Sequence, residues 1–329
     1  MTDNGRAAFE LAKGTQRVLT LGEAQVERCL DPLELVNALE DGFRALEQGL
    51  VQAPPRPKLA VPGGFSLTMP SWKPGGPIAV KVVNVFEGNP ARGLPSHLAM
   101  ILLFDAETGA TLAVLDGTAI TGLRTAAAAA LSVRLLARRD ARVATLVGAG
   151  AQARAHLRVL PLVRGFERFH VWARKPADAE RLAALHPRAV PCSDLRGALA
   201  ESDVVCLATG SATPVIAADW VRPGTHVSSV GFHPPGGELP PQLAQQHRVF
   251  VEAAHAFEPP PVGAPELARV AATQGATLGA LLLGRDPGRS SDEQITVYKA
   301  MGHAMEDLVA ATLAFQGAQK LGVGGAMDW

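Results

Sequence analysis

The chain has 329 residues, of which 47% are hydrophobic and 19% are charged, and its 31 basic residues balance its 31 acidic residues. A chain of this length and apolar content buries a large core and is expected to form two domains, while the lack of net charge argues against nucleic acid or an anionic membrane as a partner. Its three scattered cysteines form no CxxC pair, which argues against a disulfide framework and a structural zinc site. We therefore expect a cytoplasmic protein without a metal centre.

The N-terminal part of the chain is predicted to be a helix-plus-sheet region. Residues 1–14 contain no apolar core of signal-peptide length, and no later run lacks charges and prolines for long enough to span a bilayer. Apolar residues recur at helical spacing over residues 19–49, with Pro32 in a first helical turn, so this stretch predicts one or two helices. Prolines and glycines then interrupt short runs in residues 52–76. Three apolar or β-branched runs predict strands, at residues 78–85, 97–104 and 111–116.

The central part of the chain alternates between helical and strand patterns. An alanine run at residues 126–130 predicts a helix, with Thr121 or Thr125 as its cap and Arg134, Arg138 and Arg139 toward its end. Short apolar runs alternate with helical stretches after it, at residues 142–147, 169–172, 188–191, 203–208, 225–231 and 248–252. This alternation predicts a doubly wound parallel α/β sheet. Residues 293–321 return to helical patterning, followed by a glycine-rich tail.

A glycine motif marks the point where the first of these strands ends. Gly148-x-Gly150-x-x-Ala153 follows the run at residues 142–147 and opens a helix. In a dinucleotide-binding turn the first glycine permits the tight turn, the second lets backbone N–H groups meet a pyrophosphate, and the small third residue permits close helix packing. The motif therefore predicts a dinucleotide site.

The next strand lacks the acidic residue that usually binds the adenosine ribose of NAD. It ends in Ala173-Arg174-Lys175 instead. Two cations can pair with a 2′-phosphate, whereas a carboxylate would repel it. These residues favour NADP over NAD, with a solvated strand end as the alternative interpretation.

Four ordered motifs cover most of the chain. They are KVVNVFEGNPARGLPSH at residues 81–97, LDGT and TGLRTAA within residues 115–127, VGAGAQA at residues 147–153, and TVYKAMG at residues 296–302. This set resembles the ornithine cyclodeaminase and mu-crystallin family, whose members include cyclodeaminases, alanine dehydrogenases, and ketimine or pyrroline-2-carboxylate reductases. The resemblance implies a homodimer. It also implies a Rossmann-type NAD(P)-binding domain at residues 125–299 and a discontinuous α+β substrate-binding and dimerisation domain at residues 1–124 and 300–329.

The resemblance also implies roles for individual residues. It places Arg56 and Lys81 on the substrate carboxylate, with Lys81 also in the catalytic machinery. For Lys81, the apolar neighbours argue against a solvent-exposed strand lysine; for Arg56, a solvated position stays open. Arg124 and Ser96 correspond to positions near the cofactor, although the family more often has threonine where Ser96 stands. The other cofactor contacts implied are Gly148, Gly150, Ala151, Gln152, Ala173, Arg174, Lys175, Thr209, Gly231 and Ala300.

One departure from the family pattern affects the predicted reaction. Where cyclodeaminases have an aspartate after the fifth strand of the nucleotide-binding domain, this chain has His233 within VGFHPPGGEL. Replacing the aspartate removes an anion that would handle the amino groups of a diamino acid. An imidazole can donate a proton to an imine nitrogen near neutral pH, or it can be a structural loop residue.

The combined prediction is a hydride-transfer enzyme that acts on a small imino or amino acid. We expect NADPH-dependent reduction of a cyclic imino acid such as pyrroline-2-carboxylate or piperideine-2-carboxylate, with NAD as the other possible cofactor. The alternatives within the same class are an ornithine cyclodeaminase, which forms proline and ammonia from ornithine, and an alanine dehydrogenase. A different class of protein, a non-catalytic binder of NADPH or a small ligand, is disfavoured by the presence of Arg56, Lys81 and Arg124.

Overall fold

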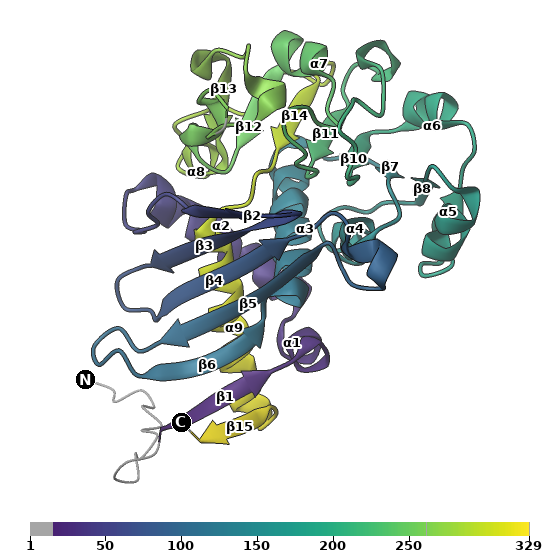
Figure 1. Ribbon diagram of the computed structural model, residues 1–329. Coiled ribbons are helices and arrows are strands. Elements are labelled where there is room, and N and C mark those ends of the chain that lie inside the picture. The colour runs from purple at the N-terminus through teal and green to yellow at the C-terminus, as the bar shows by residue number, and fades with distance from the viewer. Residues whose placement is uncertain (1–15, 261, 329) are drawn as a thin grey trace. The chain divides into compact units, whose positions relative to one another are not determined.

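The computed structural model describes residues 16–260 and 262–328, which divide into two compact units (Figure 1). Unit 1 comprises Val51–Thr121 with the described residues before Pro32 and after Glu306, and unit 2 comprises Pro32–Leu50 and Gly122–Glu306. The units divide at Thr121 and Glu306, whereas the domains implied by the resemblance divide at residues 124 and 299, and Pro32–Leu50 lies in unit 2. Residues 1–14, where no signal peptide is expected, lie outside the described residues.

Unit 1 is built on a mixed sheet that has seven strands in the described part of the chain, in the order β15-β1-β6-β5-β4-β3-β2. Strands β1 and β6 are parallel, and the other neighbouring pairs are antiparallel. The three strands predicted from the sequence are confirmed as β4, β5 and β6. The strands are β1 (Arg17–Leu21), β2 (Lys58–Val61), β3 (Gly64–Trp72), β4 (Ile78–Val85), β5 (His97–Phe104), β6 (Thr111–Asp116) and β15 (Gly325–Asp328).

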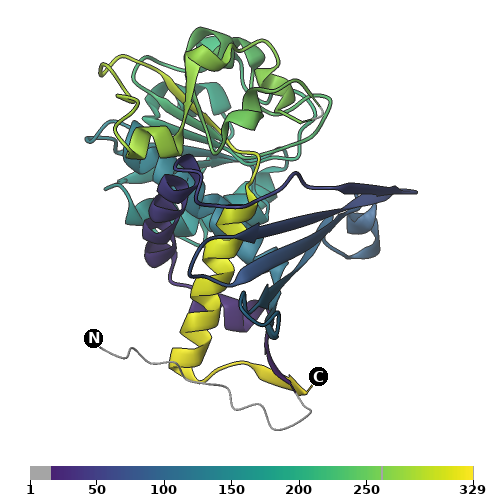
Figure 2. The ribbon, with the colours of Figure 1, turned by 90° about the vertical axis from the view of Figure 1, so that its left-hand side faces the viewer.

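The two faces of this sheet differ in cover. Lys81, Ile101 and Leu115 share one face by strand register and are buried. Helices α1 (Glu23–Cys29) and α9 (Ala304–Leu321) belong to this side, and Figure 2 shows α9 along the sheet. The opposite face carries Leu98 and Met100, which are 38% and 52% exposed. Unit 1 therefore has one packed face and one face with exposed apolar side chains.

The structure adds detail to three stretches of the sequence. The one or two helices expected over residues 19–49 are confirmed as α1 and, in unit 2, α2 (Pro32–Glu47), although the first residues of this stretch belong to strand β1. The punctuated stretch at residues 52–76 is the β2–β3 hairpin, because Gly63 adopts a left-handed φ of 82° at its turn. The glycine-rich tail contains β15, which pairs with β1. Hairpin and edge pairing, rather than local composition, determine these strands.

Unit 2 contains a parallel sheet in the order β13-β12-β14-β11-β10-β7-β8-β9. The order reverses between β7 and β10, so the doubly wound, Rossmann-type fold predicted from the sequence is confirmed. The strands are β7 (Val143–Val147), β8 (Arg168–Trp172), β9 (Ala189–Pro191), β10 (Val204–Leu207), β11 (His226–Ser229), β12 (Arg248–Val251), β13 (Gly275–Thr277) and β14 (Thr296–Lys299). Its shorter helices are α4 (Ala151–Val159), α5 (Pro176–Ala183), α6 (Leu195–Glu201), α7 (Pro241–Gln246) and α8 (Leu278–Leu282).

Helix α3 (Gly117–Leu136) begins earlier than the predicted threonine caps. Asp116 Oδ1 accepts hydrogen bonds from the N–H groups of Thr118 and Ala119 at 2.8 and 2.9 Å, so Asp116 is the cap. Arg138 and Arg139 lie beyond the end of the helix. By length and composition alone this helix could span a membrane, although it contains Arg124 and Arg134, and 72% of its apolar window is buried in the structure.

The predicted helical stretch at residues 293–321 is wrong in its first part. Thr296–Lys299 forms β14, which lies between β11 and β12, and all four residues are fully buried. A strand buried on both faces shows no alternation of polar and apolar residues, so it cannot be recognised by period. The helix of this region, α9, begins at Ala304.

Candidate cofactor and substrate site

The glycine turn after β7 has the geometry that the motif predicts. Gly148 has a φ of 121°, and a Cβ there would overlap the carbonyl oxygen of Ala208, which follows β10. Gly150 is the N-cap of α4, and no atom lies within 4 Å of the position that its Cβ would occupy. Ala153 is fully buried. The turn therefore requires glycine at residue 148 and leaves open space beside residue 150.

The start of α4 fits the pyrophosphate of a dinucleotide. The first turn of the helix has no acidic residue, so nothing there opposes an anion at its N-terminal N–H groups. Ala151 and Gln152 are the first two residues of the helix, and Gln152 Oε1 is buried without a hydrogen-bond partner among the described residues. A ligand hydroxyl could donate to that oxygen.

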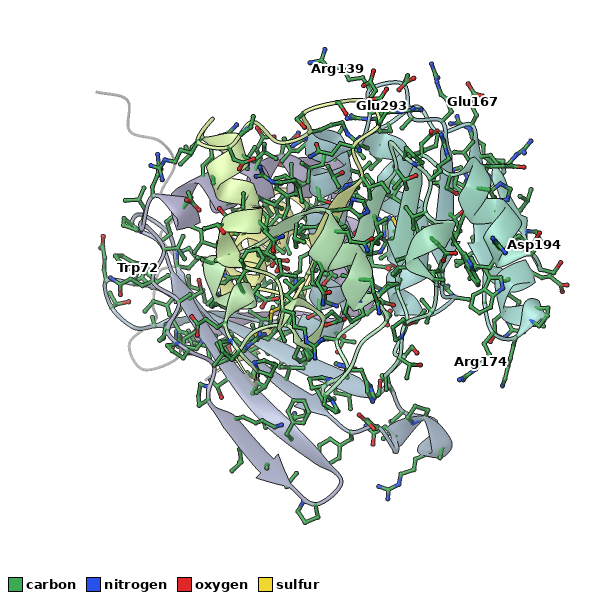
Figure 3. The ribbon with its side chains drawn as sticks, turned by 90° about the horizontal axis from the view of Figure 1, so that it is seen from above. Trp72, Arg139, Glu167, Arg174, Asp194 and Glu293 are labelled. Atoms are coloured by element: carbon green, nitrogen blue, oxygen red, sulfur yellow. The ribbon has the colours of Figure 1, made fainter. Side chains whose placement is uncertain are left out.

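The ribose end of the candidate site carries positive charge. Ala173 follows β8 directly and is half-buried, and Arg174 and Lys175 are exposed; Figure 3 shows the Arg174 side chain projecting away from the ribbon. Asp178, the first acidic residue after β8, is paired with Arg181. No carboxylate therefore stands directly after this strand.

Buried Glu238 joins the ends of β10 and β11. Its Oε2 accepts hydrogen bonds from the N–H and hydroxyl of Thr209 at 2.6 and 2.7 Å. Its Oε1 accepts from the N–H of Gly231 at 2.6 Å and from the hydroxyl of Ser229 at 3.0 Å. Two of the predicted cofactor contacts, Thr209 and Gly231, are thus brought together by one carboxylate.

A second buried charge, the Lys299 ammonium at the end of β14, reaches the same place. Its Nζ lies 2.7 Å from Glu266 Oε1 and donates hydrogen bonds to the carbonyl oxygen of Gly231 at 2.5 Å and to Ser229 Oγ at 3.2 Å. Lys299 is fully buried and Glu266 is 3% exposed. A cation and a carboxylate without solvent are held there by mutual pairing.

The turn after β14, which contains the predicted cofactor contact Ala300, is held by Glu252. This carboxylate accepts hydrogen bonds from the N–H groups of Met301 and Gly302, at 2.9 Å each for the shorter contacts. Burial, followed by the charges of Glu252 and Glu306, raises the pKa of Tyr298 well above its usual value. The phenol therefore stays neutral near neutral pH.

Arg124 is buried near the start of α9. Its Nη1 lies 3.0 Å from Glu306 Oε2, while Glu306 Oε1 accepts a hydrogen bond from the N–H of His303 at 2.7 Å. A Cβ at Gly302 would lie 2.8 Å from Arg124 Nη1, so glycine leaves room for the guanidinium. The position of Arg124 is therefore set by Glu306 and by the turn that Glu252 holds.

In unit 1, Lys81 is 2% exposed and its Nζ lies 2.6 Å from Asp307 Oδ2. A solvent-exposed lysine is therefore excluded. Burial, followed by the positive charge of Lys81, lowers the pKa of His97, and Glu87 opposes this shift. Ser96 Oγ lies 3.1 Å from His97 Nδ1. Ser96 thus lies beside a histidine whose pKa is lowered in part by the Lys81 charge.

The remaining predicted residues lie on loops. Arg56 is half-buried in unit 1 between Gln52, which bridges to Trp72, and strand β2. His233 is half-buried in unit 2, in the loop after β11, where its carbonyl oxygen accepts a hydrogen bond from the N–H of Gly236 at 3.2 Å. Among the described residues, no group of three or more His, Cys, Asp or Glu side chains could hold a metal ion.

Sequence reasoning gave no role to several residues that build the site. Lys299 belongs to the TVYKAMG motif at residues 296–302. A lysine among apolar residues is the sequence signal that could have identified it as a buried charge with a special role. Glu238, Glu252, Glu266, Glu306 and Asp307 lie in loops or at helix starts, where an acidic residue is common and gives no sequence signal.

Comparison with known proteins identifies the family of the chain. The model of the ornithine cyclodeaminase/mu-crystallin family matches residues 15–321. The Δ1-pyrroline-2-carboxylate reductase of Paracoccus denitrificans is 37% identical over 292 residues, which cover 83% of this chain and 90% of that protein. The chain therefore belongs to the ornithine cyclodeaminase/mu-crystallin family, and the resemblance drawn from the sequence is confirmed.

Solved structures extend the similarity to the fold. The Δ1-pyrroline-2-carboxylate reductase of Thermococcus litoralis in complex with NADH and L-proline has a TM-score of 0.88 and 32% identity, covering 94% of this chain and 99% of that chain. An archaeal alanine dehydrogenase dimer with bound NAD has a TM-score of 0.84 and 29% identity, covering 95% of this chain and 99% of that chain.

Proposed function

We propose that this member of the ornithine cyclodeaminase/mu-crystallin family reduces a cyclic imino acid, such as pyrroline-2-carboxylate or piperideine-2-carboxylate, with NADPH. The observation that carries the proposal is the similarity, over 94% of the chain, to a pyrroline-2-carboxylate reductase with NADH and L-proline bound. The glycine turn, the cationic ribose end and the buried Lys81 support the proposal at the level of single residues.

Arg56 and Lys81 are proposed to bind the substrate carboxylate. A guanidinium and an ammonium both pair well with a carboxylate, and the Asp307 contact restrains the Lys81 ammonium before substrate arrives. Such restraint reduces the entropy lost when the substrate is oriented.

His233 is proposed to donate a proton to the imine nitrogen while the C=N carbon is reduced. When bound, the reduced nicotinamide supplies the hydride. The product is a cyclic amino acid, and the proton and hydride together account for both added hydrogens. An imidazole suits this role because it exchanges protons near neutral pH.

NADPH is preferred to NADH in this proposal because of Arg174 and Lys175. Both side chains are exposed directly after β8, and Asp178 is already paired with Arg181. The cations can form charge-assisted hydrogen bonds with a 2′-phosphate.

A homodimer through the exposed face of the unit 1 sheet is also proposed. Leu59, Leu98 and Met100 are 66%, 38% and 52% exposed, and strand register places them on one face. The archaeal alanine dehydrogenase of similar fold is a dimer. Light scattering should give a dimer for the native protein and a smaller species for Met100→Asp, and a monomeric native protein at micromolar concentration would contradict this part.

The activity is tested with a substrate panel at the nicotinamide absorbance, using both cofactors. Pyrroline-2-carboxylate and piperideine-2-carboxylate should be reduced, and NADPH should serve better than NADH. Proline formed from ornithine must be assayed directly, because a cyclodeaminase returns its cofactor to the starting state and gives no net absorbance change. Efficient formation of proline from ornithine would show that the protein is a cyclodeaminase and not a reductase. Efficient oxidation of alanine would show that it is an alanine dehydrogenase.

A further inference from the structure

The loop at residues 231–238, which carries His233, is closed on itself by buried charge. Its last residue, Glu238, accepts a hydrogen bond from the N–H of its first residue, Gly231, at 2.6 Å. Lys299 holds the carbonyl oxygen of the same Gly231 at 2.5 Å. Both polar backbone groups of Gly231 are therefore bound to fully buried side chains.

The far part of the loop meets the partner of Lys299. A Cβ at Gly237 would overlap Glu266 Oε1, and a Cβ at Gly236 would overlap the carbonyl oxygen of Ala212. Glu266 in turn pairs with Lys299 at 2.7 Å. The Lys299–Glu266 pair thus contacts the loop both before and after His233.

Burying the charges of Glu238, Lys299 and Glu266 costs free energy unless their contacts offset it. Glu238 and Lys299 are fully buried, and Glu266 is 3% exposed. Ionised groups without water are stable only when they are paired and hydrogen-bonded. Glu238 accepts four hydrogen bonds, all from donors on or beside the ends of β10 and β11. Fixing those strand ends and the loop is the structural result of this arrangement.

We propose that Glu238, Lys299 and Glu266 are positioning residues that hold the 231–238 loop so that His233 meets the substrate imine. This inference rests on the proposed function, in which His233 donates the proton. Lys299 and Glu266 are expected to act together, because removing either charge leaves the other buried without its ion-pair partner. Their effect on turnover passes through His233.

A double-mutant cycle tests this connection. Lys299→Met and Glu266→Gln should each lower kcat for pyrroline-2-carboxylate reduction by about 10- to 100-fold, because small misplacement of a catalytic group is costly. The Lys299→Met/Glu266→Gln double variant should be no worse than Lys299→Met by more than about twofold. In a His233→Ala background, Lys299→Met should cost less than about threefold, since the group that it positions is gone.

A matched control separates positioning from stability. Asp203→Asn removes another nearly buried carboxylate, one that accepts backbone N–H groups at the opposite edge of the same sheet. It should lower the melting temperature without lowering kcat at 25 °C. Glu266→Gln keeps the side-chain size and provides the reading if Lys299→Met does not fold.

Two outcomes overturn the inference in distinguishable ways. An active native protein in which Lys299→Met and His233→Ala act additively would contradict the inference and leave the proposed function standing. A native protein that reduces no cyclic imine would remove the proposed function and this inference together.

Discussion

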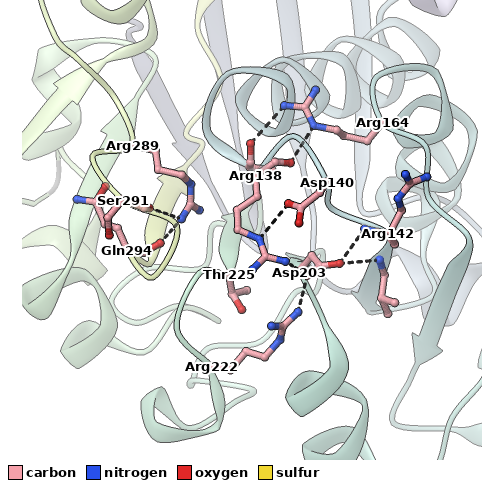
Figure 4. A network of polar contacts seen from close by, with 12 residues as sticks. Arg138, Asp140, Arg142, Arg164, Asp203, Arg222, Thr225, Arg289, Ser291 and Gln294 are labelled. Atoms are coloured by element: carbon pink, nitrogen blue, oxygen red, sulfur yellow. Dashed lines mark hydrogen bonds and ion pairs between the residues drawn. The ribbon is translucent and has the colours of Figure 1, made fainter.

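The starts of the parallel strands of unit 2 form the amino edge of its sheet, and their ends form the carboxyl edge. Buried charge lies at both edges, but its contacts differ between them. At the amino edge, Asp203 accepts hydrogen bonds from the N–H groups of Arg142 and Val143 at 2.7 and 3.0 Å and pairs with Arg138 at 2.9 Å and with Arg222 (Figure 4). The Arg138 and Arg222 side chains keep 23% and 33% of their exposure. This network remains in contact with solvent.

Other arginines at the amino edge cap the end of helix α3. Arg164 Nη2 donates to the carbonyl oxygen of Arg134 at 2.7 Å, and Arg289 Nε donates to that of Leu136 at 2.7 Å. Guanidinium groups stabilise the negative end of a helix and satisfy its last carbonyl groups. The amino edge therefore joins helices to strands with cations.

At the carboxyl edge, carboxylates predominate and most of their donors are backbone N–H groups. Glu238, Glu252 and Glu306 are at most 3% exposed and together hold the turns that follow β10, β11 and β14. Turns fixed in this way present backbone groups to a ligand. Both edges thus contain a buried acid that binds backbone N–H groups, but at the amino edge Asp203 shares its pairing with solvent-contacting arginines, whereas at the carboxyl edge Glu238 and Glu252 fix turns. We therefore expect the amino edge to matter mainly for stability and the carboxyl edge for the geometry of the site.

The largest expected effect is at the carboxyl edge. His233→Ala should lower kcat for imine reduction by about 10²- to 10⁴-fold, the usual contribution of a general acid. His247→Ala removes a half-buried histidine just before β12, at the amino edge, and should leave kcat within about twofold. Steady-state kinetics with pyrroline-2-carboxylate measure both. Undiminished turnover in His233→Ala would make His233 a structural loop residue.

The cofactor end of the carboxyl edge gives the next effect. Arg174→Ala should weaken NADPH binding by about 10- to 100-fold, because a charge-assisted hydrogen bond contributes about 1.5–3 kcal/mol. NADH binding should be unchanged, since NADH has no 2′-phosphate. Fluorescence titration measures both dissociation constants, and the exposed Arg196→Ala is the control. Equal losses for the two cofactors would argue against a 2′-phosphate contact.

A pH titration should reveal the amino edge as the stabilising one. Burial, followed by the charges of Arg289 and Arg164, lowers the pKa of His226 from 6.5 to about 3. Between these values the unfolded chain binds a proton that the folded chain does not, so stability falls as pH falls. This histidine should contribute a loss of about 2 kcal/mol between pH 7 and pH 5. Urea unfolding should show that dependence reduced in His226→Gln; an unchanged dependence would contradict a buried neutral histidine.

The smallest effect is expected from Asp203→Asn, which should lower the free energy of unfolding by about 1–2 kcal/mol at pH 7. Partial burial raises the pKa of Asp203, but the N–H groups of Arg142 and Val143 and the charges of Arg222 and Arg138 outweigh it and lower the pKa below its usual value. The stability from the ionised carboxylate is present above about pH 4 and is lost as pH falls through the folded pKa. Urea unfolding of the variant should therefore approach that of the native protein at low pH, and an equal difference at all pH values would contradict this.

Local patterns predicted much of the fold. The β-branched runs gave β4 to β6, and the alternation of runs gave the doubly wound sheet, because both depend on neighbours in sequence. β14 was missed because its burial on both faces erases alternation, and β15 because its pairing with β1 is far apart in sequence.

The residues of the candidate site also differ in how far the sequence could predict them. Gly148 was predictable because its backbone conformation restricts the residue type, and the structure gives it a φ of 121°. Glu238 and Glu266 were not, because their roles arise from hydrogen bonds to residues that the fold brings near. Sequence patterns thus show where backbone shape is special, and tertiary contacts show which side chains maintain it.

The acylation rates of two buried lysines can report local opening of the two units. Among the described residues, Lys81 and Lys299 are buried, whereas Lys58, Lys73, Lys175 and Lys320 are at least partly exposed. An acylating reagent modifies an accessible, uncharged amine, so acylation of a buried lysine requires local opening. Mass spectrometry of slow acylation would therefore report the opening of unit 1 through Lys81 and of unit 2 through Lys299, each under native conditions.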